Sequence, residues 1–287
     1  MPKPLLKILP YGSCSAHDPV YNLGQRGLAF PVWYRIRARE TLYAHTIGEF
    51  IQLTKFLRGD LAIERSIRRY ICIDYDFEPG EEARKAVDDA ELILLEICTS
   101  ENIKLDGWFL HRNQLPRLFM KPMMDSEILS GDVKKAVTFW WAGLTNRKDQ
   151  QQIEAAKVVA AHLPAEADDE VTRAILFGAR LVADTQQEIE DGVDQLLSLQ
   201  QRRSAIFLIH YRRFMPDGRA ICWPPELRGH LYAIAKRLNV EIFDPAQMIV
   251  DHGVGAAIAA DQLHYEKAFV PIVADALWRT IKSEARA

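Results

Sequence analysis

The sequence predicts an α/β protein built on a doubly wound parallel sheet. Two observations favour this fold class: five short apolar runs occur along the chain, and amphipathic helical patterns lie between them. The runs are almost continuously apolar rather than alternating, which is typical of parallel strands covered on both faces. In chain order, the predicted strands are Leu5–Tyr11, Tyr70–Tyr75, Glu91–Cys98, Ala205–Tyr211 and Val240–Phe243.

Helical patterns alternate with these strands. The pattern over Pro224–Leu238 begins with proline, as many helices do, and its apolar residues recur along one stripe. The other patterns cover Glu40–Leu57, Glu81–Ala90 and Glu266–Ala285. Five parallel strands that alternate with helices predict a flavodoxin-like three-layer sandwich with a five-stranded parallel sheet.

The stretch from about 100 to 203 interrupts this alternation. We expect it to be a large, mostly helical insertion between strands 3 and 4, with helical patterns over Asp149–Leu163 and Asp168–Arg202. Such an insertion can form a lid, a substrate wall or a homodimer contact, or it can pack as extra helices beside the sheet. The sequence shows no internal repeat and no low-complexity linker, so we predict a single domain over residues 1–287.

Composition excludes several classes of partner. The formal net charge is -3 and the isoelectric point about 6.3, which gives no bulk attraction to nucleic acid or to an anionic membrane surface. We find no apolar stretch long enough for a signal peptide or a membrane span. The four cysteines form no CxxC motif, which fits a reducing compartment. We therefore predict a cytoplasmic protein.

The end of the first predicted strand carries a candidate nucleophile. There the chain reads Gly12-Ser13-Cys14-Ser15. Gly12 permits a tight turn, and a helix that follows the turn would add a partial positive charge, which favours a thiolate and a developing oxyanion. Cys14 is the predicted nucleophile; Ser13 and Ser15 are the alternatives, and each would need a base within the same reach.

A candidate base lies near the other end of the chain. Asp261 precedes His264 by three residues, after a loop of small residues and before the last helix. His264 can take the thiol proton and return it to a leaving group, while Asp261 accepts from the other imidazole nitrogen. The alternative is that Asp261 only caps the last helix. Together with Cys14, these two residues predict a Cys-His-Asp triad.

Further residues are candidates for substrate binding. His17 follows the turn closely, and Arg37 alternates with Arg35 and Arg39, so that the three point the same way in an extended segment and can clamp an anion. A solvated surface is the alternative for these arginines. We expect His210, at the end of the fourth run, to be a buried, hydrogen-bonded core histidine. No HxxxH-type pair supports a metal site, so we predict none.

These motifs resemble those of the SGNH or GDSL hydrolases. Laid on that pattern, Gly12 matches the glycine of Gly-Asp-Ser, Ser13 matches the aspartate, and Cys14 takes the position of the serine nucleophile. Asp261 and His264 match the terminal Asp-x-x-His pair. The Gly-Ser-Cys variant resembles the GSCFA-type branch. It is also similar to WcbI-type capsule-biosynthesis proteins, a resemblance that implies acyl transfer with coenzyme A.

One block of the SGNH pattern is absent. The family's Gly-x-Asn-Asp block implies an oxyanion asparagine after strand 3, and this chain has Glu96-Ile97-Cys98-Thr99-Ser100-Glu101-Asn102 instead. Ser100 and Asn102 are the candidate replacement donors. The difference weakens the case for a simple esterase and leaves acyl transfer, or a lost activity, open.

The predicted function is therefore an SGNH-like acyltransferase, or an esterase or thioesterase, that acts in polysaccharide or other glycan biosynthesis. The resemblance implies a small-molecule or glycan acyl substrate and coenzyme A thioester as co-substrate, with no tightly bound cofactor. Gly12, Ser13, Ser15, His17, Arg37 and Ser100 form the predicted oxyanion and substrate-binding group. Two alternatives are a catalytically inactive binding or accessory protein and a flavodoxin-like nucleotide or regulatory domain, which would bind phosphate at the first turn.

Overall fold

The computed structural model describes residues 5–33, 42–144, 150–214 and 219–284, and it divides the chain into two compact units. Unit 1 consists of Met1–Ala62, Phe77–Ser100 and Asp184–Ala287. Unit 2 consists of Ile63–Asp76 and Glu101–Ala183. Within the described ranges, no helix is long and apolar enough to cross a membrane.

Unit 1 contains the predicted five-stranded parallel sheet. Its strands are β1 (Leu6–Tyr11), β2 (Ala29–Pro31), β3 (Leu92–Leu95), β7 (Ser204–Leu208) and β10 (Glu241–Phe243). They pair in the order β10-β7-β3-β1-β2, and every pair is parallel. This is the flavodoxin-like order, and it confirms the predicted fold class.

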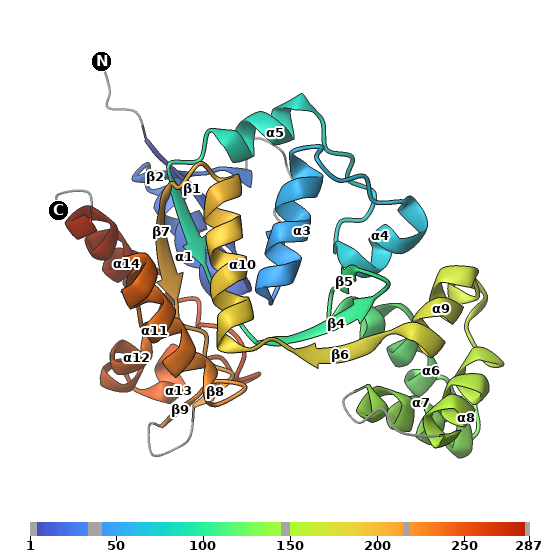
Figure 1. Cartoon of the computed structure of the whole chain (residues 1–287). Helices are drawn as coiled ribbons and strands as arrows, with labels where there is room; N and C mark the ends of the chain where they lie inside the picture. The colour runs from blue at the N-terminus through green and yellow to red at the C-terminus, as the bar shows by residue number, and fades with distance from the viewer. Residues whose placement is uncertain (1–4, 34–41, 145–149, 215–218, 285–287) are drawn as a thin grey trace. The chain divides into compact units, whose positions relative to one another are not determined.

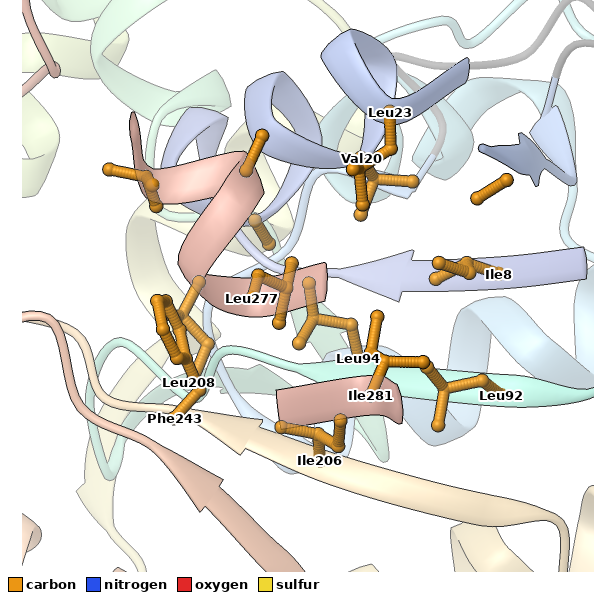
Figure 2. Close-up of a cluster of buried hydrophobic side chains, with 14 of the residues drawn as sticks. Ile8, Val20, Leu23, Leu92, Leu94, Ile206, Leu208, Phe243, Leu277 and Ile281 are labelled. Atoms are coloured by element: carbon orange, nitrogen blue, oxygen red, sulfur yellow. The ribbon is translucent and has the colours of Figure 1, made fainter. Parts of the chain in front are cut away.

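Helices cover both faces of this sheet (Figure 1). On one face lie α1 (Cys14–Gln25) and α14 (Val270–Glu284), whose apolar side chains pack on alternate strand residues such as Ile8, Leu94 and Ile206 (Figure 2). On the other face, the ring of Tyr11 packs 5.2 Å from that of Phe50 in α3 (Ile47–Leu57). Most residues of β1, β3 and β7 are buried on both faces of the sheet, which explains why these strands are predominantly apolar.

The remaining elements of unit 1 connect the strands. The longer helices are α5 (Glu81–Asp88), α10 (Gln186–Leu199) and α11 (Leu227–Leu238), and the shorter ones are α12 (Ala246–His252) and α13 (Val254–Ala257). A two-stranded antiparallel sheet, β8 (Arg213–Phe214) with β9 (Ala220–Ile221), follows β7.

The second predicted strand is wrong. Part of the run Tyr70–Tyr75 ends a helix, α4 (Arg65–Ile71), which belongs to unit 2. Ile67 and Ile71 lie one helical turn apart and are both buried, and so short an apolar run does not separate helix from strand. The second strand of the sheet is β2, only three residues long, whose Pro31 is tolerated because β2 is an edge strand.

The predicted insertion is not purely helical. Besides α4, unit 2 contains a three-stranded antiparallel sheet of β4 (Glu101–Leu105), β5 (Trp108–Leu110) and β6 (Arg180–Ala183). Its helices are a π-helix (Pro116–Met120), α6 (Lys121–Asp125), α7 (Gly131–Gly143), α8 (Gln150–Ala160), a 3₁₀ helix (Ala165–Ala167) and α9 (Glu170–Gly178). The long helical pattern Asp168–Arg202 is broken into α9, β6 and α10, and α10 belongs to unit 1. That the whole chain acts as one domain stays a prediction.

Candidate functional site

The turn after β1 is shaped by the contact between Gly12 and Glu96. Gly12 has a φ of +142°, a conformation that residues with a side chain rarely adopt. A Cβ atom at Gly12 would lie 2.5 Å from Cβ of Glu96 and 2.6 Å from its Oε2. Only glycine therefore lets the buried Glu96 side chain lie directly against the turn.

Cys14 is the first residue of α1. The side chain of Ser13 caps this helix by accepting a hydrogen bond from the backbone N–H of Ser15 at 3.2 Å. The thiol of Cys14 is partly exposed and donates to the hydroxyl of Tyr43 at 3.7 Å. Because the N-terminus of a helix carries a partial positive charge, this position stabilises negative charge on sulfur or on a neighbouring oxyanion.

Glu96 connects this turn to His210. Its carboxylate accepts from the backbone N–H of Ser13 at 2.7 Å and from the Ser13 hydroxyl at 2.8 Å. Its other oxygen lies 2.7 Å from Nδ1 of His210, which follows β7. The Glu96 side chain is fully buried and that of His210 is 18% exposed. The carboxyl ends of β1, β3 and β7 therefore converge on one carboxylate.

Glu96, Cys98 and His210 place three potential metal ligand atoms within 4.8 Å of one another. Both oxygens of Glu96 also take part in hydrogen bonds, with Ser13 and with Nδ1 of His210. Burial raises the pKa of the Cys98 thiol well above its ordinary value, and the nearby Glu96 and Glu49 raise it further. The Cys98 thiol itself lies 3.5 Å from the backbone carbonyl of Glu96, so the three residues form one polar cluster around Glu96.

Asp261 and His264 form a hydrogen-bonded pair on a surface hairpin. The hairpin is closed by a bridge between Ile258 and Tyr265. Oδ2 of Asp261 lies 2.6 Å from Nδ1 of His264, and Oδ1 accepts from the backbone N–H groups of Leu263 and His264. The hydrogen bond from the backbone N–H of Leu263 has the largest effect, followed by that from the His264 side chain, and together they lower the pKa of Asp261 to about 2. Asp261 thus both caps the local turn and orients the imidazole.

The turn and the hairpin meet at one cavity. A small cavity of about 20 Å³ is lined by Ser15 of the turn, by Glu96 after β3, and by Leu263 and Tyr265 of the hairpin. The side chains of Ser15 and Tyr265 are also hydrogen-bonded to each other. The sequence neighbours of Cys14 and His264 therefore lie together, although the two predicted pieces come from opposite ends of the chain. Contact between the Cys14 thiol and His264 itself stays a prediction.

A larger cavity adjoins the small one. It has a volume of about 730 Å³ and shares Phe214, Ile258 and Gln262 with the small cavity. Its other lining residues come mainly from the start and end of α13 and include Glu266. The hairpin that carries His264 thus contributes lining residues to both cavities.

The other predicted site residues have different positions. His17 is buried in α1, and its ring lies 4.5 Å from that of Tyr43, the residue that Cys14 also contacts. Ser100 is buried, and its backbone carbonyl accepts from the N–H of Asp184. Arg37 lies outside the described residues. The N–H and O–H groups of Ser13 both donate to Glu96, which makes Ser13 a structural cap rather than a nucleophile.

The roles of Glu96, Tyr43 and Tyr265 were not predicted from the sequence. For His210 we expected a hydrogen bond, but its partner was not identified. A sequence signal existed for the pair Glu96 and His210: Glu96 directly follows β3, His210 comes two residues after the end of β7, and ligands gather beyond the carboxyl ends of such strands. Tyr43 and Tyr265 lie in loops, and no pattern in the sequence marks them.

The fold and these side chains define a class of protein: a doubly wound α/β protein with a partly exposed cysteine at a helix N-terminus and two histidine–carboxylate pairs beyond the sheet's strands. The chain belongs to the TviD N-terminal domain family, whose model matches residues 6–280. That family is related to Vi capsule polysaccharide biosynthesis, which is compatible with the expected similarity to WcbI-type capsule proteins. A search of curated proteins finds no match. The SGNH resemblance stays a prediction.

We expect Cys14 to be the one thiol that alkylates readily in the folded protein at neutral pH. Burial raises the pKa of Cys72 to about 12 and that of Cys222 to about 11, and it raises that of Cys98 as well. A raised pKa keeps a thiol protonated, and thus unreactive, until the pH approaches that value. Iodoacetamide at pH 7.5 should therefore add about one equivalent by intact mass. The variant Cys14→Ser should add none, and rapid labelling of that variant would contradict the expectation.

Proposed function

We propose that the protein is an acyl-transfer enzyme that uses Cys14 as its nucleophile. The sulfur of Cys14 attacks the carbonyl carbon of an ester or thioester, the bond to the leaving oxygen or sulfur breaks, and an acyl-cysteine forms. An acceptor hydroxyl or water then attacks this acyl group and releases the Cys14 sulfur. His264, oriented by Asp261, transfers protons in this sequence of steps.

The observation that carries the proposal is the meeting of the turn and the hairpin at one cavity. Ser15, next to Cys14, is hydrogen-bonded to Tyr265, next to His264. The hydrogen bond between Asp261 and His264 holds one imidazole nitrogen, which leaves the other for proton transfer. A nucleophile at a helix N-terminus, a base and an orienting carboxylate are the parts that acyl transfer requires.

For the donor, we propose a coenzyme A thioester, and for the acceptor, a sugar hydroxyl of a glycan. The relation of the family to capsule polysaccharide biosynthesis supports a glycan acceptor. The cavity of about 730 Å³ beside the hairpin is within the usual size range of small-molecule sites, and it supports a bound substrate there. In this scheme the thioester is a co-substrate, and the protein holds no permanent cofactor.

The decisive experiment is to trap the acyl-enzyme. We expect incubation with acetyl-coenzyme A or p-nitrophenyl acetate to add one acetyl group to the intact protein, and peptide mapping to place it on Cys14. Cys14→Ala is the test variant, and Cys72→Ala, at a buried thiol of unit 2, is the matched control that should still acylate. Acylation that persists in Cys14→Ala, or none in the native protein with either donor, would reject the proposed function and favour a binding protein.

A further inference from the structure

We propose that His210 is a second proton-transferring imidazole of this site, with Glu96 as its positioning residue. This inference rests on the proposed acyl transfer and divides its proton transfers between two histidines. His210 serves the sulfur of Cys14, and His264 serves the acceptor hydroxyl. From the sequence alone, His264 is expected to perform both steps and His210 to be a core residue.

Glu96 fixes the tautomer of His210. One of its oxygens accepts from Ser13, and the other lies 2.7 Å from Nδ1 of His210. Because a carboxylic acid is a stronger acid than an imidazolium, the shared proton resides on Nδ1. Nε2 of the neutral imidazole then has a lone pair and acts as the base. The same reasoning applies to Asp261 and His264, so the site contains two imidazoles that are each held by a carboxylate at Nδ1.

The contacts of Glu96 link His210 to the Cys14 turn. Glu96 packs against Gly12, accepts two hydrogen bonds from Ser13 and lines the small cavity together with Ser15. The residues before Cys14 thus contact the carboxylate that holds His210, and the residue after Cys14 lines the same small cavity. The Asp261–His264 pair differs, because its two side chains are about half exposed on a hairpin, at 48% and 47%. An exposed imidazole suits an acceptor that arrives from solvent.

The reaction has two half-reactions: the acyl group first moves to Cys14 and then to the acceptor. Nε2 of His210 takes the thiol proton, the Cys14 thiolate bonds to the thioester carbonyl carbon, and the bond from that carbon to the leaving sulfur breaks. The His210 imidazolium protonates the departing thiolate. In the second half-reaction, His264 takes the proton of the acceptor hydroxyl, whose oxygen bonds to the acyl carbon as the bond to Cys14 breaks. The Cys14 thiolate regains a proton from the His264 imidazolium through solvent.

The test measures the rate at which iodoacetamide alkylates Cys14 across a range of pH, a readout that needs no acyl transfer. In His210→Gln we expect the rate at neutral pH to fall roughly tenfold or more and the pH profile to move upward by about one unit, because the thiolate loses its imidazolium partner. Glu96→Gln, which keeps the shape but not the charge, should move the profile in the same direction. His264→Gln should slow alkylation less and mainly slow transfer to the acceptor. The exposed His162→Gln is the matched control.

Each outcome decides for or against the proposal. Circular dichroism confirms that the variants are folded, and Glu96→Gln provides a second test in case His210→Gln is not. A folded His210→Gln protein with the native alkylation rate and pH profile overturns the role of His210, whether or not Cys14 is acylated. A stoichiometric metal in the native protein, lost in both His210→Gln and Cys98→Ala, also overturns it. Failure of Cys14 to acylate would instead reject the proposed function while leaving the coupling between His210 and Cys14 measurable.

Discussion

Replacing His264 with alanine is expected to lower turnover of acyl thioesters and p-nitrophenyl esters by about 10²–10⁴-fold. The variant removes the imidazole that we propose as the base. In the native protein, Asp261 lies 2.6 Å from Nδ1 of this ring and thereby orients Nε2 for proton transfer. The side chain is about half exposed, so its loss should not unfold the protein. Steady-state kinetics with acetyl-coenzyme A and p-nitrophenyl acetate measure the effect.

Asp261→Asn is the companion variant for this prediction. The amide can still accept from the backbone N–H of Leu263, but it cannot stabilise an imidazolium on His264. Because the pKa of Asp261 is lowered to about 2, its carboxylate is ionised at every pH above about 3, and its charge would be lost only in stronger acid. Titration of Asp261 should therefore contribute nothing to the pH profile near neutrality. Native turnover in both Cys14→Ala and His264→Ala would disprove the triad.

Replacing Gly12 with alanine is expected to destabilise the fold by about 3 kcal/mol or more, from backbone strain and a steric clash together. The new Cβ would lie 2.5 Å from Cβ of Glu96, at a φ of +142° that alanine rarely adopts. Relief of the clash requires Glu96 to move, which would break its hydrogen bonds to Ser13 and His210. We therefore expect both lower stability and slower alkylation of Cys14. Urea unfolding followed by circular dichroism measures the first effect.

Gly27→Ala separates the two physical contributions. Gly27 also has a positive φ, +67°, but a Cβ there would meet nothing within 4 Å. Gly27→Ala should lower the free energy of unfolding by about 1 kcal/mol, because only the left-handed backbone conformation is unfavourable for alanine there. If the two variants lose the same stability, or if Gly12→Ala is as stable as the native protein, then Glu96 does not lie against the turn as the structure shows.

The sequence alone was sufficient to predict those parts of the fold and the site that depend on local residue patterns. Continuous apolar runs identified four of the five parallel strands, because strands buried on both faces have no polar side to show. The pattern failed at Tyr70–Tyr75, a run too short to separate helix from strand, and at β2, which has only three residues. The Gly-Ser-Cys turn was predictable because a tight turn after a strand has its own residue requirements.

Tertiary structure alone decided which side chains meet at the site. Glu96 and His210 are 114 residues apart in the chain and become partners because β3 and β7 pair in parallel, which brings their carboxyl ends together. Strand order follows from packing across the whole sheet, and no local pattern encodes it. Asp261 and His264 could be paired from the sequence because they lie within one turn. The partners of Glu96 could not be predicted from the sequence, because they reach Glu96 only when strands that are distant in the chain pair through backbone hydrogen bonds.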